Sequence, residues 1–238
     1  MYNYPLLLTA TINPSKDKSL HLADPEKRHK QYIETLLKFV FESNFTHFVF
    51  CENSTYDLKH IKYIKNIAES IGKYIEILQF LGDAKKTEMY TSAYGDQEIM
   101  EYAVSKSKFI AWAGWFYKIT WRYRIENINE ILYARSNKKT VFVKWWLFKK
   151  TAHTAFFKCS VPYFITHFEW KSNQLKKFGN SLEYLYYYYI AQSGIKMSIH
   201  WVHPYFSAEW GSGGRIDQSW FMKLKTKIFA YFWIYDIN

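Results

Sequence analysis

Two basic residues and a threonine alternate within the stretch 116–124, and this spacing could place them on one side of a strand. Side chains two positions apart in a strand point to the same face, so Lys118, Thr120 and Arg122 would form one cationic, hydroxyl-bearing row. Such a row suits a diphosphate, because charge-assisted hydrogen bonds to phosphate oxygens are among the strong ones. The alternative is a basic edge strand in solvent, where lysine and arginine are common.

The N-terminal half of the sequence contains the elements that would position this row. Short apolar runs predict buried strands, and one of the helices between them starts with Asp24 as its cap and Pro25 at its first position. The alternation of strands and helices predicts a parallel sheet with crossover helices. The predicted strands cover 6–12, 47–51, 75–80 and 109–112, and further helices are predicted at 58–71, 97–105 and 181–192.

Polar turns follow the predicted strands, and ligands of parallel sheets bind where loops leave the carboxyl ends of the strands. The loops at 11–13, 52–54 and 82–94 are therefore the predicted ligand-binding loops. The sequence contains neither a GxGxxG fingerprint nor a GxxxxGKS/T phosphate loop. We therefore do not expect a dinucleotide or ATP site of the usual kind.

The composition limits the classes of protein to which the chain could belong. Its 238 residues are 49% hydrophobic, which is enough for one sizeable core. The net charge of +11 suits nucleic acid, anionic lipid or a phosphate-bearing small molecule as a partner. Aromatic residues make up 21% of the chain. Their rings suit half-wet surfaces such as sugar sites, although AT-rich codon usage also favours Tyr and Phe.

Three features predict a cytoplasmic location. The chain has two cysteines, Cys51 and Cys159, which is typical of a reducing compartment and not of a disulfide framework. Residues 1–5 carry no basic segment, so no signal peptide is predicted. No apolar run reaches the ~18 residues of a membrane span. Contact with the inner face of the plasma membrane would then be peripheral.

Six segments follow one another in an order that covers most of the chain. They are LLLTATI at 6–12, FCENS at 50–54, GDQE at 95–98, KITWRY at 118–123, LEY at 182–184 and GSGG at 211–214. Together they resemble a family of small bacterial glycosyltransferases of capsule and lipopolysaccharide clusters, whose box reads KITGRY. Trp121 stands where the family has glycine, and Trp210 departs from its glycine- and serine-rich segment in a similar way. The resemblance implies an α/β, Rossmann-like and GT-A-like fold, a mostly parallel sheet flanked by helices with an aromatic-rich C-terminal part.

The resemblance also implies a function and a division of labour along the chain. It implies one domain over 1–238, with a nucleotide-sugar-binding half at 1–135 and an acceptor-side half at 136–238, which moves a sugar to a surface glycan. Lys118 and Arg122 would neutralise the leaving diphosphate, on which charge develops in the transition state. The implied donor-binding residues are Thr9, Ala10, Thr11, Glu52, Asn53, Ser54, Lys118, Thr120 and Arg122, and Trp210, Ser212 and Gly213 would lie on the acceptor side.

Inverting sugar transfer needs a carboxylate that takes the proton of the acceptor hydroxyl. Glu183 and Asp96 are the favoured candidates for this catalytic base, and Glu98, Glu101 and Asp217 are the others. Glu183 follows Ser181 at a predicted helix start, so interaction with the helix dipole is its alternative role. No Asp-x-Asp pair occurs, so we expect no divalent metal and no other cofactor. His200 and His203 would fall on opposite faces of a strand, which disfavours a zinc pair.

Two other classes of protein stay open. A nucleic-acid binder is favoured by the charge and by the lysines and aromatic residues at 138–158, but no recognised nucleic-acid module occurs. A membrane-surface protein without catalysis is favoured by residues 220–229, which mix aromatic and basic side chains. The partners that the resemblance implies are a nucleotide-sugar donor and a glycan or lipid-linked acceptor, with an anionic membrane surface nearby and no nucleic acid.

Overall fold

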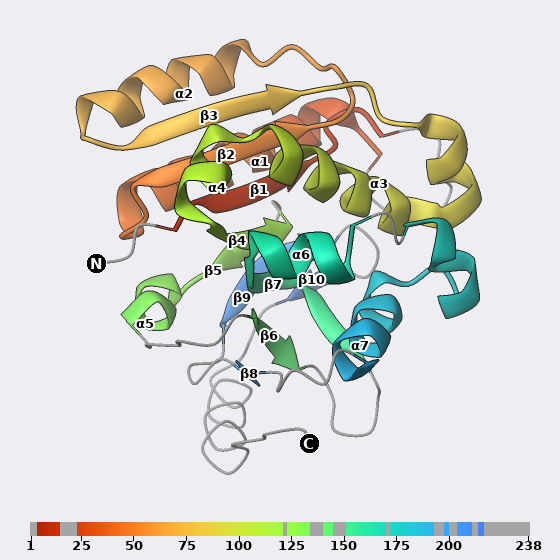
Figure 1. Ribbon diagram of the computed structural model, residues 1–238. Helices are drawn as coiled ribbons and strands as arrows, with labels where there is room; N and C mark the ends of the chain where they lie inside the picture. Colours follow the sequence, from red (N-terminus) through yellow and green to blue (C-terminus); the bar gives the residue numbers. More distant parts are fainter. Residues whose placement is uncertain are drawn as a thin grey trace.

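A seven-stranded mixed sheet lies at the centre of the protein (Figure 1). The computed structural model describes residues 4–14, 23–120, 123–133, 140–144, 151–169, 172–192, 198–199, 204–210 and 214–216. The strands of this sheet are β1 (Leu6–Ala10), β2 (His47–Glu52), β3 (Tyr74–Gln79), β4 (Trp115–Thr120), β6 (Thr140–Lys144), β7 (Ala152–Ser160) and β8 (Ser198–Ile199). A separate three-stranded sheet contains β5 (Arg124–Ile125), β9 (Phe206–Trp210) and β10 (Gly214–Ile216).

The large sheet is parallel at one end and mixed at the other. Its strand order is β3-β2-β1-β4-β7-β6-β8. The first four strands in this order run parallel to one another, whereas β7 is antiparallel to both β4 and β6. Because parallel strands end at the same edge of a sheet, the carboxyl ends of β1, β2, β3 and β4 lie together.

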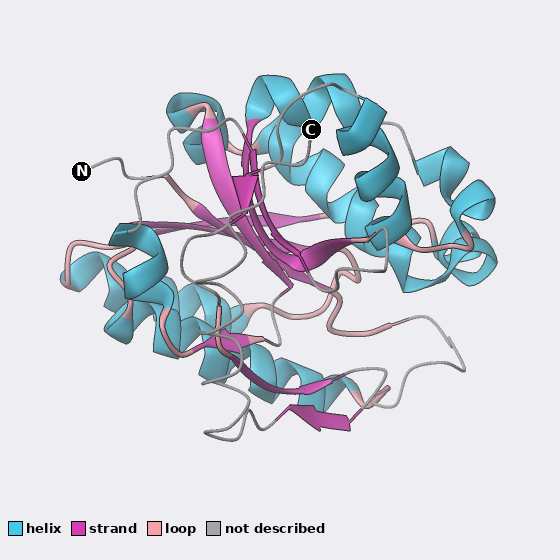
Figure 2. Cartoon of the chain, turned by 90° about the horizontal axis from the view of Figure 1, so that it is seen from below, coloured by secondary structure: helices cyan, strands magenta, loops and turns pink. Residues whose placement is uncertain are grey.

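Helices cover both faces of this sheet (Figure 2). One face packs against α1 (Pro25–Glu42), α2 (Lys59–Ser70) and α5 (Ile128–Tyr133). The other face packs against α3 (Ala84–Lys106), α4 (Lys108–Ala113), α6 (Val161–His167) and α7 (Leu182–Gln192), and a 3₁₀ helix at Ser172–Phe178 precedes α7. The sheet therefore separates two hydrophobic cores.

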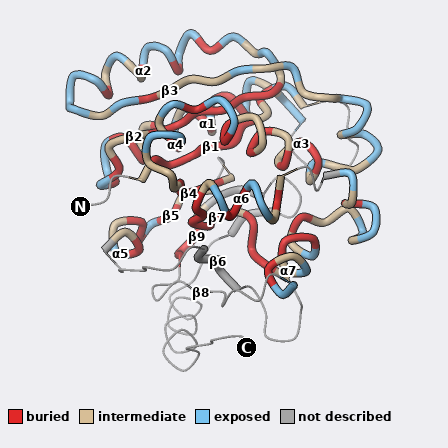
Figure 3. Tube along the Cα trace, viewed as in Figure 1, coloured by how far each residue is buried: buried red, intermediate tan, exposed pale blue. Residues whose placement is uncertain are grey.

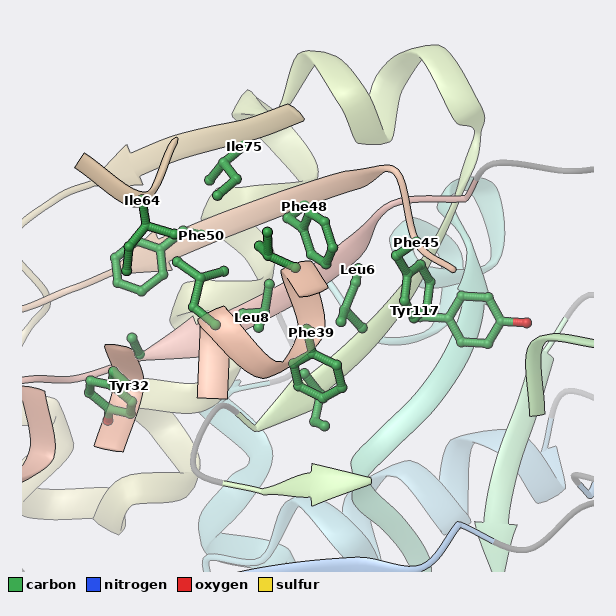
Figure 4. Close-up of a cluster of buried hydrophobic side chains, with 14 of the residues drawn as sticks. Leu6, Leu8, Tyr32, Phe39, Phe45, Phe48, Phe50, Ile64, Ile75 and Tyr117 are labelled. Carbon is green, nitrogen blue, oxygen red and sulfur yellow. The ribbon is translucent and has the colours of Figure 1, made fainter. Parts of the chain in front are cut away.

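β1 is buried along its whole length, because it has a strand on either side and helices over both faces. Leu6 and Leu8 pack into the core under α1 and α2 (Figure 4), and Leu7 packs into the core under α3 and α7. A strand buried on two faces needs a continuous apolar run instead of alternation. The exposed residues of the molecule lie mainly on the outer faces of the helices, as α2 shows (Figure 3).

The strands predicted at 6–12, 47–51 and 75–80 are confirmed, and so is the helix start at Asp24, whose carboxylate accepts from the backbone N–H of Glu26 at 2.9 Å. The strand predicted at 109–112 is wrong, because these residues form α4.

A cap and a distant carboxylate decide this local structure. The Ser107 hydroxyl accepts from the N–H of Ile110 at 3.1 Å, and Glu76 of β3 accepts from the N–H of Lys108 at 2.9 Å. Both satisfy orphan donors of a helix start. Gly114, with a φ of 65°, then ends the helix in a left-handed conformation that suits glycine, and β4 begins at Trp115.

Lys158 of β7 is a buried cation enclosed by aromatic rings. Its ammonium nitrogen lies 4.5 Å from the ring centre of Tyr4, 4.8 Å from that of Trp115 and 5.9 Å from that of Tyr117. These distances permit cation–π attraction, which favours the charged form. Burial acts in the opposite direction and lowers the pKa of Lys158 to about 8. The Lys158 side chain thus makes the free energy of unfolding depend on pH in the alkaline range.

We expect the free energy of unfolding to gain a contribution from Lys158 as the pH rises from 8 to 10.5. The folded chain releases the Lys158 proton near pH 8, while the unfolded chain keeps it up to the ordinary value of 10.5. Stability rises with pH where the unfolded state binds more protons. Urea unfolding across this range should show the contribution as a difference between the wild type and Lys158→Met. In Lys65→Met, a surface control, the pH dependence should match the wild type. Parallel curves for the wild type and Lys158→Met would refute the assignment.

Candidate functional site

Polar side chains gather at the carboxyl end of β4, on the face of the sheet that α3 and α7 cover. Thr9 of β1 lies opposite Thr120 of β4, and β7 runs antiparallel to β4, so its first residues reach this end. Hydrogen bonds link the group into one network, which we call the Lys118 cluster. Its members are Thr9, Asp96, Lys118, Thr120, Thr154 and Glu183.

Lys118 is the centre of this cluster and is fully buried, with 0% of its side chain exposed. Its ammonium group donates to Asp96 Oδ2 at 2.5 Å, to Thr120 Oγ1 at 2.7 Å and to the carbonyl oxygen of Thr154 at 3.0 Å. An ammonium has three hydrogens, so each of them already has an acceptor. A direct contact of Lys118 with a phosphate would therefore require one of these bonds to break.

Asp96 comes from α3 and joins β1 to β4. Its Oδ1 accepts from the Thr9 hydroxyl at 2.8 Å, and its Oδ2 accepts from Lys118. The side chain is 21% exposed, so the carboxylate lies between the buried lysine and solvent. α3 kinks before it reaches Asp96, at Thr91, whose φ is 67°. This angle is strained for a β-branched residue, and the Thr91 hydroxyl bonds to the carbonyl oxygen of Asn180 at 3.3 Å.

Glu183 lies in the first turn of α7 and is only partly buried. Its Oε1 accepts from the Thr154 hydroxyl at 3.0 Å, and its Oε2 accepts from the Ser181 hydroxyl at 2.8 Å. Thr154 also holds Lys118 through its carbonyl oxygen. The two carboxylates favoured from the sequence as catalytic bases therefore belong to one network, although they are separated in the chain and come from different helices.

Glu52 organises the adjacent strand ends. It is fully buried, and its Oε1 accepts from the N–H groups of Ile12 at 3.2 Å and Ser54 at 2.7 Å and also from the Ser54 hydroxyl. Its Oε2 accepts from the Gln79 side-chain amide at 3.0 Å. One carboxylate therefore ties together the segments that follow β1 and β2 and the last residue of β3.

Asn53 connects this region to α3. Its side-chain oxygen accepts from the Thr11 hydroxyl at 2.6 Å, and its backbone oxygen accepts from the N–H of Gly82 at 2.9 Å. A Cβ at Gly82 would lie 2.7 Å from Glu98 Oε2 and 3.2 Å from the Asn53 carbonyl oxygen, so glycine permits this close approach. Burial raises the pKa of the Glu98 carboxyl, which also accepts from the N–H of Asp83 at 3.1 Å.

The structure brings most of the expected site residues to one edge of the sheet. Ala10 ends β1, and the 52–54 turn lies beside it, because the N–H of Asn53 donates to the Ala10 carbonyl oxygen at 3.2 Å. Arg122, Ser212 and Gly213 lie outside the described residues, as do His200 and His203. Trp210 is the last residue of β9, in the smaller sheet.

Two residues of this region were missed from the sequence. Arg28 is buried, and its Nε donates to the carbonyl oxygen of Thr11 at 2.7 Å. Its helical phase with Tyr32 and Leu36 is the signal that could have placed it on the inner face of α1. Thr154 gave a weaker signal, as a hydroxyl next to the apolar run that follows it in β7.

Two features of the described residues bear on metal binding and on membrane insertion. His, Cys, Asp and Glu side chains of that part of the chain do not gather in groups of three or more that could hold a metal ion. None of its helices is long and apolar enough to cross a membrane.

No protein-family model matches the sequence, and no curated protein matches it. The crystal structure of the glycosyltransferase GlyE from Streptococcus pneumoniae TIGR4 superposes on 84% of this chain, with a TM-score of 0.55 and 6% identity. The fold is GT-A-like.

This chain corresponds to only part of GlyE. This chain covers 45% of GlyE, which is less than half of that protein's length. HddC from Yersinia pseudotuberculosis overlaps 67% of this chain and 77% of its own, at a TM-score of 0.44 and 8% identity. The likeness to GlyE therefore establishes a mixed α/β fold with a mostly parallel central sheet flanked by helices.

Proposed function

We propose that the chain is a glycosyltransferase that moves a sugar from a nucleotide-sugar donor to a surface-glycan acceptor of the capsule or lipopolysaccharide type. The observation that carries the proposal is the Lys118 cluster, in which buried Lys118 and Thr154 connect the carboxylates of Asp96 and Glu183. The cluster lies at the carboxyl edge of parallel strands, where ligands of such sheets bind. The GT-A-like fold shared with the glycosyltransferase GlyE supports the same activity.

The contacts of the two carboxylates favour different roles. Asp96 is ion-paired to Lys118, whereas the hydrogen bonds that hold Glu183 come from neutral hydroxyls. We assign the base to Glu183, since a carboxylate paired with a cation is the poorer proton acceptor. In inverting transfer, the acceptor oxygen would bond to the anomeric carbon, the bond from that carbon to the diphosphate would break with its electron pair, and Glu183 would take the hydroxyl proton.

The donor is expected to lie over the ends of β1, β2 and β4. Thr9, Ala10, Thr11 and the 52–54 turn are proposed to shape its site, with Arg122 as the cation for the diphosphate. Lys118 would act indirectly, without contacting the donor, because its three ammonium hydrogens are already donated to groups of the protein. Trp210, Ser212 and Gly213 are proposed to face the acceptor. We further propose that the reaction needs no divalent metal and takes place on the cytoplasmic side, with peripheral contact to the membrane.

A thermal-shift screen tests the proposal. The chain is heated with UDP, GDP, ADP, dTDP or CMP, each with EDTA or manganese, and with a DNA oligonucleotide for comparison. One nucleotide at 100 times its Kd should stabilise the fold by about 2.7 kcal/mol, which is a rise in Tm of about 5–10 °C for a chain of this length. We expect this shift to persist in EDTA.

Two results would contradict the proposal, and a third would contradict one part of it. The first is a Tm that no nucleotide raises by more than the scatter of the measurement. The second is stabilisation by the oligonucleotide alone, with the steep salt dependence of phosphate-backbone binding. A shift and a transfer activity that vanish in EDTA and return with manganese would refute the metal independence alone.

A further inference from the structure

Thr154 is the residue through which the two carboxylates of the Lys118 cluster are connected. It is 5% exposed and lies in β7, two residues before Phe156, which pairs with Ile119 of β4. Its carbonyl oxygen accepts from Lys118 at 3.0 Å, and its hydroxyl donates to Glu183 Oε1 at 3.0 Å. Thr154 therefore contacts Lys118, the ion-pair partner of Asp96, through its backbone and contacts Glu183 through its side chain.

We propose that Thr154 is a positioning residue that fixes the proposed base, Glu183, relative to Asp96. The inference rests on the proposed function. Asp96 holds Lys118, Lys118 holds the Thr154 carbonyl, and the Thr154 hydroxyl holds Glu183. Because Lys118 and Thr154 are buried, both connecting groups are shielded from water, and hydrogen bonds in such surroundings are electrostatically stronger than in solvent.

The geometry leaves Glu183 able to act as a base. A carboxylate oxygen has two lone-pair positions, so each oxygen of Glu183 can accept a further hydrogen besides those from Thr154 and Ser181. Without the Thr154 hydroxyl, the Glu183 side chain keeps its contact with Ser181 and gains rotational freedom about its own bonds. Misplacement of a reacting group by about 1 Å can cost about 100-fold in rate. The expected effect is therefore on turnover and not on donor binding.

The test compares Thr154→Val, which keeps the shape and the backbone carbonyl, with Thr154→Ser, which restores the hydroxyl. Nucleotide release is measured with the nucleotide sugar whose nucleotide gives the largest thermal shift. In Thr154→Val we expect kcat to fall by about 10-fold to 100-fold, with the donor KM unchanged.

Two reference variants separate positioning from stability. Thr154→Ser should regain most of the turnover. Thr35→Val, at a buried threonine of α1 on the other face of the sheet, should leave kcat and the donor KM as in the wild type. The melting temperature of each variant is measured in parallel.

The outcomes separate this inference from the proposed function. If Glu183→Gln keeps full turnover, the assignment of Glu183 as the base is refuted, and so is the positioning role of Thr154. If Glu183→Gln is inactive but Thr154→Val matches the wild type in kcat, only the positioning role is overturned. Equal losses in Thr154→Val and Thr154→Ser, in step with melting temperature, would mean a purely structural role. Absence of turnover by the wild type with every donor would overturn both.

Discussion

Replacement of Lys118 by alanine is expected to lower the free energy of unfolding by about 3 kcal/mol, at the lower end for a broken buried ion pair. The ammonium is fully buried, while its partner Asp96 is 21% exposed and can regain some hydration. The substitution also leaves the Thr154 carbonyl and the Thr120 hydroxyl without their donor. Denaturant unfolding gives the free energy directly, and the Tm should fall by about 6–12 °C for a chain of this length.

Matched variants isolate the charge from the volume of Lys118. Lys118→Met keeps most of the side-chain volume, so a similar loss there would assign the effect to the ion pair and its hydrogen bonds. Lys65→Ala, in a surface pair with Glu69 of α2, should cost no more than about 1 kcal/mol. A loss in Lys118→Ala no larger than that of Lys65→Ala would contradict the buried arrangement.

The second large effect is expected on turnover. Glu183→Gln should lower kcat by about 100-fold to 10,000-fold, the usual contribution of a general base. Glutamine keeps the length of the side chain and one oxygen that can accept from Thr154, so the fold and the nucleotide-induced thermal shift should be retained. Nucleotide release under saturating donor measures the change. Glu69→Gln, at an exposed position of α2, is the control that should stay at the wild-type rate.

A Glu183→Gln variant with kcat near that of the wild type would exclude Glu183 as the base. Asp96→Asn should behave differently from Glu183→Gln, because it removes the ion pair of Lys118 and hence acts on stability. The two substitutions therefore distinguish the proton acceptor from the group that anchors the cluster.

The parallel part of the sheet could be predicted because its signal is local. The runs LLLTA and HFVFCE are mostly apolar, and each is buried from end to end or nearly so. The short run at 109–112 was ambiguous between strand and helix, as apolar runs of this length are. The structure decides it with Glu76, which reaches α4 from β3, a contact far apart in the chain that periodicity does not encode.

The site shows the same division between local and distant information. The position of Lys118 and Thr120 on one face follows from alternation, and the bond between them agrees with it. The burial of Lys118 does not follow, because it depends on Asp96 from α3 and on Thr154 from β7. Sequence spacing suggested a cation facing a ligand, whereas the tertiary contacts give it three acceptors inside the protein.

The carboxylate of Glu52 limits how the loops of this edge could diverge during evolution. The segments after β1 and β2 and the end of β3 share this one anchor, so an insertion at any of the three would shift the other two. Length changes are therefore harder to accommodate here than in loops with separate supports. A lineage that altered the specificity proposed for this site would find more freedom around α7, where Glu183 is held by single side-chain contacts, than beside Glu52.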